Sequence, residues 1–438
     1  MSCSDDTPNP ISNDDTESPS AVDDLSVGFT TGYTATLFFT ATGDDGIYGR
    51  ARTYEVRYAT TFIDSANYSL ANKFTSPNQP HVGTADDTIV VTGLLPNTKY
   101  YFAVKVADEV PNWSDISNID SAQTLLGGLW TVFNTANSDL VDNDIYEIQS
   151  AAGIKYISTL SSVSAFDNTN WTTIYDSSLT PLIIDTIPFL TDTIFDTLDF
   201  SFANSIDVEN SNKIWLGTQS NGVALLEGDS IVFYRSNDSG LLTSTRDIKI
   251  SQNKLWVGTL ANGLHSFNLD GSNIWNQYTV PGNGTFNGQI NCLESDINGN
   301  VWAGLQLFGT AVFNNGSFTN YGSPEFTNQA VWDIYASTNE ILFGTDAGAF
   351  VFENNVWTNY VMTDSGLPDN VVTSVVIDNV GTKWFGTRFG LTSFDGSSWT
   401  IYTTSNSFLP DNWINILHVD MFGTLWIGTK NGLAKFTP

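Results

Sequence analysis

The fold is decided by one stretch near the carboxyl end, Leu425-Trp426-Ile427-Gly428-Thr429-Lys430-Asn431-Gly432-Leu433-Ala434-Lys435-Phe436. Two apolar segments flank a short Lys-Asn-Gly sequence, and this pattern predicts a strand, a tight turn and a second strand. Close copies of the stretch recur upstream through more than half of the chain. A repeat of this kind indicates one supersecondary unit that is used several times.

The copies are evenly spaced. Each has a large apolar residue, one more residue and then Gly-Thr or a close variant, followed by a Gly and a second apolar strand. Their intervals run from 40 to 46 residues, and the large residues are Trp215, Trp256, Trp302, Leu342, Trp384 and Trp426. A degenerate copy begins at Tyr156, which lies 59 residues before Trp215. The longer interval implies an insertion, placed at residues 181–200.

Each unit contains two further strands. An apolar strand ending in an Asp-x-x-Gly turn precedes the large residue, and a Trp-Thr-x-Tyr strand or a relative follows the motif. Four short strands repeated at this period predict a blade of a β-propeller. The inner three strands occur seven times, whereas an unassigned outer strand, residues 129–133, precedes them all. We therefore predict a seven-bladed propeller over residues 129–438, closed by the strand at 129–133.

Residues 26–124 have a different pattern. Short alternating segments lie between Gly, Pro, Asp and Asn turns, which predicts a small β-sandwich and, with the propeller, an all-β fold class. The segment resembles a fibronectin type III module. The resemblance lies in the residues at its tyrosine corner (Leu94, Pro96, Thr98 and Tyr100), in the strand Tyr54–Tyr58 and in the loop 108–114. It implies a spacer or a weak interaction surface, with Tyr100 packed in the core.

Residues 1–25 are rich in Ser, Asp, Asn, Thr and Pro and are predicted to form a disordered tether. The sequence Cys3-Ser4-Asp5-Asp6 resembles the mature amino terminus of bacterial lipoproteins, which implies lipidation at Cys3. The chain has no apolar run of 18 residues. We therefore expect contact with a membrane only through a lipid anchor, and a location at the bacterial cell surface, in the periplasm or outside the cell.

The formal net charge of −31 excludes nucleic acid as an expected partner, because the phosphate backbone would be repelled. Solubility explains such acidity, and weak binding of divalent cations is the alternative. No EF-hand spacing or nonapeptide calcium repeat occurs. The two cysteines, Cys3 and Cys292, form no cysteine framework or metal cluster, and we expect Cys292 to be buried. No metal and no cofactor are expected.

The repeat itself resembles the two-component-regulator propeller repeat, through the order Leu-Pro-Asp-Asn, apolar strand, Asp-x-x-Gly, Trp-x-Gly-Thr and Gly-Leu-x-x-Phe. That repeat builds periplasmic sensor regions of bacterial hybrid histidine kinases, which detect carbohydrate-derived ligands. It also occurs in secreted proteins and lipoproteins. This chain has one propeller rather than two, and neither a spanning helix nor a kinase. Signalling by this polypeptide alone is therefore not expected.

Candidate ligand contacts lie where the repeats differ. Loops between the second and third strands, and loops between blades, should meet on one face of the propeller. Amides, a few cations and aromatic rings at these positions suit a sugar or another polar ligand with apolar faces. The candidates are Asp144, Gln219, Arg246, Asn262, Gln289, Gln306, Trp332, Asp346, Arg388, Trp413 and Lys430. Ordinary loop variation is the alternative explanation. The inserted hairpin at 181–200 is expected to project over the same face.

No catalytic residues are predicted. The chain has three histidines, of which His265 and His418 fall on predicted strands in different blades. No nucleophile elbow, phosphate-binding loop or zincin motif is present. Three hypotheses remain: a non-enzymatic recognition protein for a glycan or a partner protein, a structural or adhesion scaffold, and a propeller-type polysaccharide lyase or hydrolase.

Overall fold

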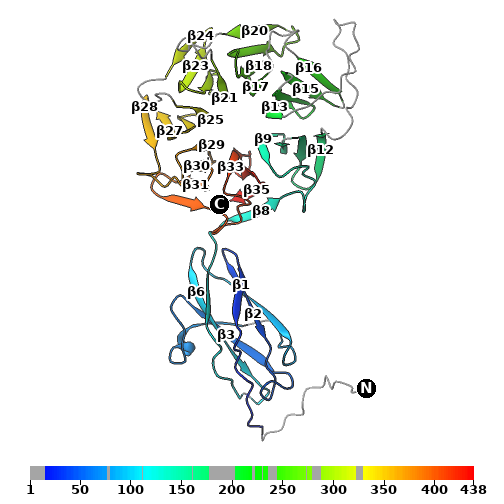
Figure 1. Ribbon diagram of the computed structural model, residues 1–438, viewed down its shortest axis with the longest axis vertical. Coiled ribbons are helices and arrows are strands. Elements are labelled where there is room, and N and C mark those ends of the chain that lie inside the picture. The colour runs from blue at the N-terminus through cyan, green and yellow to red at the C-terminus, as the bar shows by residue number, and fades with distance from the viewer. Residues whose placement is uncertain are drawn as a thin grey trace. The chain divides into compact units, whose positions relative to one another are not determined.

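Strands make up nearly all of the regular structure (Figure 1). The computed structural model describes residues 15–75, 79–110, 112–159, 161–176, 203–219, 222–228, 230–234, 244–272, 274–278, 288–321 and 329–438. Within these residues the only helix is one 3₁₀ turn, η1 (Tyr68–Leu70). None of the described residues forms a helix with the length and hydropathy needed to span a membrane. The chain divides into two units, with the division between Gly128 and Leu129.

The first unit is a sandwich of two antiparallel sheets. One sheet has the order β1-β2-β5 and the other β4-β3-β6-β7. The strands are β1 (Ser26–Thr30), β2 (Thr34–Thr40), β3 (Thr53–Ala59), β4 (Asn72–Phe74), β5 (Asp86–Thr92), β6 (Lys99–Ala107) and β7 (Asp120–Gln123). Alternate residues of β2, β5 and β3 are buried, as expected for strands with one solvated face. Tyr100 is buried, and its hydroxyl accepts a hydrogen bond from the Leu95 N–H at 3.1 Å.

The sandwich begins before its first strand. The predicted tether extends through residue 25, but Val22 and Leu25 are only 1% and 3% exposed and belong to the sandwich core. Asn118 fixes this segment, because its side chain accepts from the Leu25 N–H at 2.8 Å and donates to the Leu25 carbonyl at 2.8 Å. Val22 and Leu25 thus pack this segment against the sandwich, although its other residues are typical of a tether.

The second unit consists of seven four-stranded sheets, which we call blades 1 to 7. Strands are numbered within a blade from the innermost to the outermost. Blade 1 contains β9 (Ile145–Ala151), β10 (Ile154–Thr159), β11 (Ser162–Phe166) and β12 (Trp171–Asp176). Blade 2 contains β13 (Ala203–Asn210), β14 (Lys213–Thr218), β15 (Val223–Glu227) and β16 (Ser230–Tyr234). Blade 3 contains β17 (Thr245–Ser251), β18 (Lys254–Thr259), β19 (Leu264–Asn268) and β20 (Trp275–Tyr278).

Blades 4 to 7 repeat this order. Blade 4 contains β21 (Ile290–Ser295), β22 (Val301–Leu305), β23 (Thr310–Asn314) and β24 (Ser317–Asn320), and blade 5 contains β25 (Val331–Ala336), β26 (Glu340–Thr345), β27 (Gly348–Glu353) and β28 (Val356–Tyr360). Blade 6 contains β29 (Val372–Ile377), β30 (Lys383–Thr387), β31 (Leu391–Phe394) and β32 (Trp399–Tyr402). Blade 7 contains β33 (Ile414–Val419), β34 (Leu425–Thr429) and β35 (Gly432–Thr437) with β8 (Leu129–Phe133). The last blade thus takes its outer strand from the start of the unit, because β8 pairs with β35 from Phe133↔Leu433 to Leu129↔Thr437.

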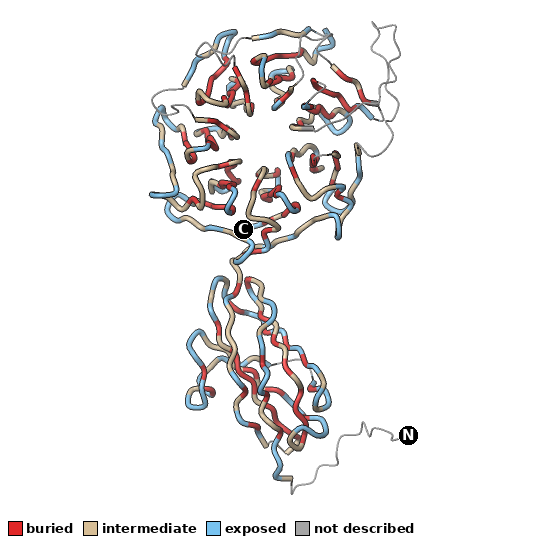
Figure 2. The backbone as a smooth tube through the Cα atoms, in the orientation of Figure 1, coloured by how far each residue is buried: buried red, intermediate tan, exposed pale blue. Residues whose placement is uncertain are grey.

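The blades form a closed ring. Each first strand contacts the first strands of both neighbouring blades, and β33 contacts β9 (Figure 1). Buried residues concentrate in the second and third strands, whereas the outer strands are more exposed (Figure 2). At the closure, Trp426 and Leu433 of blade 7 share one apolar cluster with Ile145, Ile148 and Ile157 of blade 1. The all-β fold class and the propeller predicted from the repeat are confirmed.

The repeated Trp and the repeated Asp-x-x-Gly turn depend on each other. In blade 7, one carboxylate oxygen of Asp420 accepts from the backbone N–H groups of Phe422 and Thr424, and the other accepts from Trp426 Nε1 at 3.0 Å. The pairs Asp378–Trp384 and Asp296–Trp302 are arranged in the same way. The carboxylate therefore holds the turn and satisfies an indole N–H that would otherwise be buried without a partner.

The repeated Gly permits close packing between blades. A Cβ atom added to Gly386 would lie 2.6 Å from Ile414 Cγ2 in the first strand of the next blade. At the ring closure, a Cβ on Gly428 would lie 2.8 Å from Ile145 Cγ2. The glycine is thus required at this position because no side chain fits between the sheets.

Candidate functional site

The loops proposed from the sequence come together on one face of the propeller, which we call the recognition face. The turn between the second and third strands of a blade lies beside the loop that enters its first strand. In blade 7 the Lys430 N–H donates to the Trp413 carbonyl at 3.2 Å. In blade 4 the Gln306 N–H donates to the Gln289 carbonyl at 3.1 Å. In these two blades, the bonds place variable residues from two loops side by side.

One group of side chains on this face is built around Trp413. Lys430 Nζ lies 3.9 Å from the centre of the indole ring, and Arg388 Cζ of blade 6 lies 4.9 Å from it. Both distances are within the range of cation–π contact. Arg388 and Lys430 are exposed, whereas Trp413 is half-buried. The Asp411 carboxylate accepts from the Trp413 N–H at 2.8 Å and so fixes the loop that carries the ring.

Asp144 of blade 1 joins this group across the ring closure. Its carboxylate accepts from Asn415 Nδ2 of blade 7 at 2.8 Å. Partial burial raises the pKa of Asp144, while the hydrogen bond from Asn415 and the charge of Lys430 act in the opposite direction. We define Asp144, Arg388, Trp413 and Lys430 as the Trp413 cluster. It presents two cations, a carboxylate and an aromatic ring from three consecutive blades.

The other predicted contacts lie in blades 2 to 5. Among the described residues, no hydrogen bond, ion pair or ring contact connects their side chains with the Trp413 cluster. Asp346 is engaged locally, since its carboxylate accepts from the Ala330 N–H at 3.2 Å. Trp332 is half-buried, and its indole N–H has no hydrogen-bond partner among the described residues. The remaining residues of this set are Gln219, Arg246, Asn262, Gln289 and Gln306, of which Gln219 and Arg246 are exposed.

A β-bulge in every first strand was not foreseen from the sequence. The register of each first strand shifts by one residue just after the strand enters the sheet, on the recognition face. A bulge turns the side chain of the extra residue in a new direction. The extra residues, from blade 1 to blade 7, are Tyr146, Asn204, Arg246, Asn291, Trp332, Thr373 and Asn415.

The bulge residues fall into two groups. Asn204, Asn291, Thr373 and Asn415 each donate a hydrogen bond of 2.6 to 3.1 Å to a backbone carbonyl in the first strand of the next blade. Tyr146, Arg246 and Trp332 make no such bond in the described part of the chain. Their larger side chains occupy alternate blades. The four small residues therefore connect the blades, whereas the three large ones make no such connection in the described part of the chain.

Carboxylates next to the bulges connect the blades as well. Asp247 accepts from the Leu293 N–H of the next blade at 2.6 Å, and Asp333 accepts from the Val375 N–H at 2.7 Å. These donors lie on the inner edge of the ring, where no further strand pairs with them. Burial raises the pKa of Asp247 to about 7 and that of Asp333 to about 6. Burial and the charges of these two residues raise the pKa of Glu147.

None of the three histidines belongs to the recognition face. His81 lies in the sandwich, where its Nδ1 is 2.6 Å from the Asp87 carboxylate. His418 contacts Ser150 Oγ at 2.7 Å between blades 7 and 1, and burial lowers its pKa to about 4. His265 is 1% exposed, and burial lowers its pKa to about 4. Neither propeller histidine is presented to a ligand on the recognition face.

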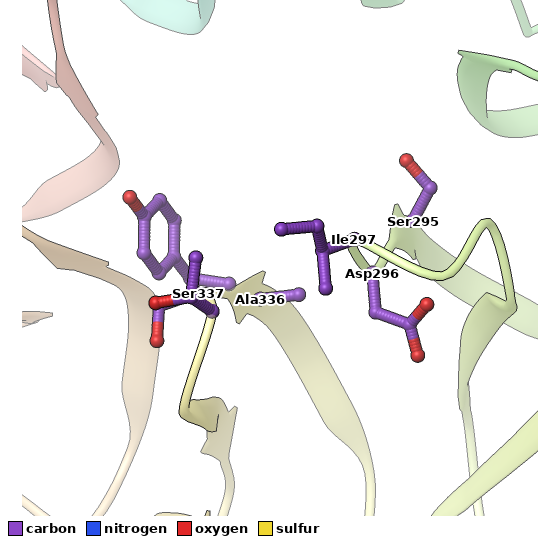
Figure 3. A pocket seen from close by; sticks show the side chains of 7 residues that line it. Ser295, Asp296, Ile297, Ala336 and Ser337 are labelled. Carbon is purple, nitrogen blue, oxygen red and sulfur yellow. The ribbon is translucent and has the colours of Figure 1, made fainter.

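The opposite face holds a pocket that is not predicted from the sequence (Figure 3). Its volume is about 440 Å³, and it lies between the turn after β21 and the end of β25. Ser295, Asp296 and Ile297 line one side, and Tyr335 to Thr338 line the other. Ile297 is 72% exposed, so the pocket is shallow and half apolar rather than an enclosed polar site.

Two predictions concern residues outside the described part of the chain, namely lipidation at Cys3 and the hairpin at 181–200. Cys292 is 5% exposed and is a free thiol. Its place is on β21, where Sγ lies 3.8 Å from the Val331 carbonyl of the next blade. Within the described ranges, no group of three or more His, Cys, Asp or Glu side chains is arranged to hold a metal ion.

No protein-family model matches the chain, and no curated protein matches it in sequence. Solved structures do resemble it. The extracellular domain of the hybrid two-component system BT4673 from B. thetaiotaomicron superposes with a TM-score of 0.54 at 16% identity, over 70% of this chain and 39% of that one. PorZ, a surface component of the type-IX secretion system of Porphyromonas gingivalis, gives a TM-score of 0.54 at 16% identity, over 94% of this chain and 62% of PorZ.

A third similar structure is an enzyme. Virginiamycin B lyase from Staphylococcus aureus has a TM-score of 0.54 at 12% identity, and the match covers 71% of this chain and 100% of the lyase. The chain thus spans well under two thirds of the BT4673 domain and the full length of the lyase. Sequence identities this low show a common fold alone. The comparisons therefore show that the chain shares a propeller fold with an extracellular domain of a two-component system, a secretion component and a lyase.

Proposed function

We propose that this protein is a non-enzymatic recognition protein of the bacterial cell surface or periplasm, and that the recognition face of its propeller binds a carbohydrate-like ligand. The observation that carries the proposal is the Trp413 cluster. An indole ring can stack on the apolar face of a sugar, while guanidinium, ammonium and carboxylate groups bind its hydroxyls or its acidic substituents.

The alternation of the bulge residues supports the same proposal. Tyr146, Arg246 and Trp332 are large side chains at positions that other blades use for structural hydrogen bonds. Their types match those of the Trp413 cluster, an aromatic ring or a cation. A ligand that reaches from the cluster across the recognition face would meet stacking and polar groups in alternate blades.

The proposed location rests on the amino-terminal sequence and on the comparisons with solved structures. Cys3 is proposed as the site of a lipid anchor, and the structures similar to this chain include an extracellular sensor domain and a surface component of a secretion system. With a net charge of −31, the protein is not expected to bind nucleic acid. The sandwich, which we propose to be a fibronectin type III module, serves as a spacer in this account.

A glycan-array screen tests the proposal. The full chain should bind a restricted set of glycans, and Arg388→Ala and Trp413→Ala should each reduce that binding roughly tenfold or more, the loss expected for one stacking or charged contact. Ile297→Ala, which truncates an exposed apolar side chain on the opposite face, serves as the control and should leave binding unchanged.

Two outcomes would replace the proposal. Capture of a partner protein by the full chain, with no glycan bound on the array, would favour the scaffold hypothesis. Release of unsaturated products from uronic-acid polymers, lost in His418→Ala, would favour the lyase hypothesis. The second result requires His418 to act from between blades 7 and 1, where its neutral ring contacts Ser150.

A further inference from the structure

The recognition face carries cations that have no carboxylate partner. Arg246, Arg388 and Lys430 are exposed, and in the described part of the chain none of them forms an ion pair. The chain has 47 acidic residues against 16 Lys and Arg, so unpaired cations are not explained by a shortage of carboxylates. Other cations of the propeller form ion pairs with Asp or Glu, namely Lys155, Lys213, Lys249 and Lys383.

Arg388 and Lys430 occupy the same position in adjacent blades. Each follows the Thr of the repeated Gly-Thr and begins the turn between the second and third strands. The hydroxyl groups of Thr387 and Thr429 close these turns, since they donate to backbone carbonyls across them at 2.8 and 2.7 Å. The turns thus present both cations from a fixed backbone. At the equivalent position, blades 1 to 5 carry Leu160, Gln219, Leu260, Gln306 and Asp346.

Trp413 positions both cations beside one ring. Lys430 Nζ lies 3.9 Å and Arg388 Cζ 4.9 Å from the centre of the indole. A cation–π contact orients a cation but leaves its positive charge uncancelled. The two charges repel each other, and an anion in contact with both would offset that repulsion. The arrangement therefore suits a ligand with an acidic group.

The carboxylates near these cations are used by the loops themselves. Asp411 accepts from the Trp413 N–H at 2.8 Å, and Asp142 accepts from the Asp144 N–H at 3.2 Å. The carboxylate of Asp144 accepts from Asn415 Nδ2 at 2.8 Å. These acidic side chains hold the backbone and the blade boundary in place, and they leave the guanidinium and the ammonium group to a ligand.

We infer that the recognition face selects an acidic glycan, in which a carboxylate or a sulfate group of one sugar is bound by Arg388 and Lys430. The inference rests on the proposed function and narrows its class of ligand. The planar guanidinium of Arg388 can donate two parallel hydrogen bonds to such a group, and the ammonium of Lys430 adds a second charge-assisted bond.

The net charge of −31 limits the kind of acidic glycan. A long, densely charged chain would meet repulsion from the acidic surface as nucleic acid would. At about 0.15 M salt, however, charges more than about 8 Å away are largely screened. An acidic group on a single sugar would then interact chiefly with its near neighbours, so the ligand expected is a glycan with isolated acidic sugars.

Matched pairs of oligosaccharides test the inference by calorimetric titration of the full chain at about 0.15 M salt. Each pair consists of a uronic-acid or sulfated oligosaccharide and its carboxyl-reduced or desulfated counterpart. The acidic member should bind roughly tenfold or more tightly. Arg388→Gln and Lys430→Gln should each weaken binding of the acidic member roughly tenfold and change binding of the neutral member by less than about twofold. Lys254→Gln is the control, because Lys254 also lacks a carboxylate partner but begins β18 at its opposite-face end.

Asp144→Asn supplies a readout of opposite sign. It removes a negative charge that acts on Lys430, so binding of the acidic member should tighten several-fold while binding of the neutral member stays the same. A loss of affinity for the acidic member in this variant would contradict the inference.

Three other results would overturn the inference. If both members of a pair bind alike, or if the two cation variants weaken both members equally, the recognition function stands but its ligand is neutral. Selective binding of acidic members that survives in Arg388→Gln and Lys430→Gln would place the acidic group elsewhere. Binding of no oligosaccharide or array glycan would remove the proposed function and this inference with it.

Discussion

His265 has an imidazole ring in a place where the propeller offers no hydrogen bond. It is 1% exposed on β19, and neither ring nitrogen has a partner among the described residues. At the same register position, blade 5 carries Phe350 and blade 7 carries Ala434. The position therefore accepts an apolar ring or a small side chain, and the imidazole nitrogens are buried at a cost in stability.

We predict that His265→Phe stabilises the protein by about 1 kcal/mol at neutral pH, since it removes two unpaired polar atoms and keeps a ring. The gain should widen in acid. The folded-state pKa is about 4 and the ordinary value is 6.5, so between these values the unfolded wild type binds a proton that the folded state does not. Stability of the wild type is therefore lost as pH falls through this window.

Urea unfolding at pH 7.5 and at about pH 4.5 measures both effects. The advantage of His265→Phe should be larger by roughly 2 kcal/mol at the lower pH. All other titrating groups are shared by the two proteins and cancel in the difference. An advantage that stays constant with pH would show that His265 ionises normally in the folded state.

The individual residues of the site could be predicted only in part. Variation between repeats pointed to Arg388, Trp413 and Lys430, because the framework of each repeat is constant while these positions differ. Their contact with one another could not be read from the repeat, since it depends on side-chain directions across blade boundaries. Tyr146 was missed because the choice in blade 1 fell on Asp144, two residues earlier, and a one-residue bulge leaves no mark in the alternation of a short strand that would favour Tyr146.

Single elements of the propeller are stabilised by the Asp-x-x-Gly turn that joins the first two strands. In blade 6, Asp378 accepts from the N–H groups of Val380 and Thr382 at 3.0 and 2.9 Å, and from Trp384 Nε1 at 3.0 Å. Asp378 is 9% exposed and Trp384 is 2% exposed. The hairpin and the packing between blades thus depend on one carboxylate.

Asp378→Ala is expected to destabilise the protein by about 3 kcal/mol, because it leaves one buried indole N–H and two turn N–H groups without their acceptor. Asp395→Ala is a suitable control. Asp395 also accepts from backbone N–H groups in a turn of blade 6, but it is exposed and holds no indole. Asp395→Ala should lower the free energy of unfolding, measured by chemical denaturation, by less than about 1 kcal/mol. Equal losses in the two variants would contradict the account of the turn.

At the scale of elements the sequence was most informative for the inner three strands of each blade. Their apolar runs and turn signals repeat, so each copy supports the others. The segment at 15–25 was assigned to the tether because most of its residues are polar. The apolar residues Val22 and Leu25 gave too little signal, since their packing partners lie far away in the sequence. The spacing of six residues from Asp378 to Trp384 was visible, but only the structure shows that the two side chains bond. The likeness of the sandwich to a fibronectin type III module stays a prediction.

The whole propeller is closed by a contact between the two ends of the unit. Trp130 of β8 stacks on Phe436 of β35, with ring centres 4.2 Å apart. Lys155 of blade 1 adds a buried ion pair with Asp420 of blade 7 at 2.9 Å, and its ammonium lies 5.1 Å from the Trp426 ring. The pairing of β8 with β35 completes the seventh four-stranded sheet, and opening it exposes the edges of both strands.

Trp130→Ala should therefore disturb more of the propeller than the equivalent change elsewhere. Trp275 is a matched control, because it occupies the same register position on the outer strand of blade 3, opposite Phe267. Each variant should lose about 2 kcal/mol of local packing. Hydrogen exchange should rise across β33, β35 and β9 in Trp130→Ala, but only within blade 3 in Trp275→Ala. The same confined pattern in both variants would show that the closure has no special role.

The most direct test of the proposed function is a calorimetric titration of the full chain with a glycan that it retains on the array. The wild type should bind it at one site, Trp413→Phe should keep most of the affinity, and Trp413→Ala should lose roughly tenfold or more, because the ring rather than the loop makes the contact. Unchanged affinity in Trp413→Ala and Arg388→Ala, with binding still saturable, would contradict recognition at the Trp413 cluster.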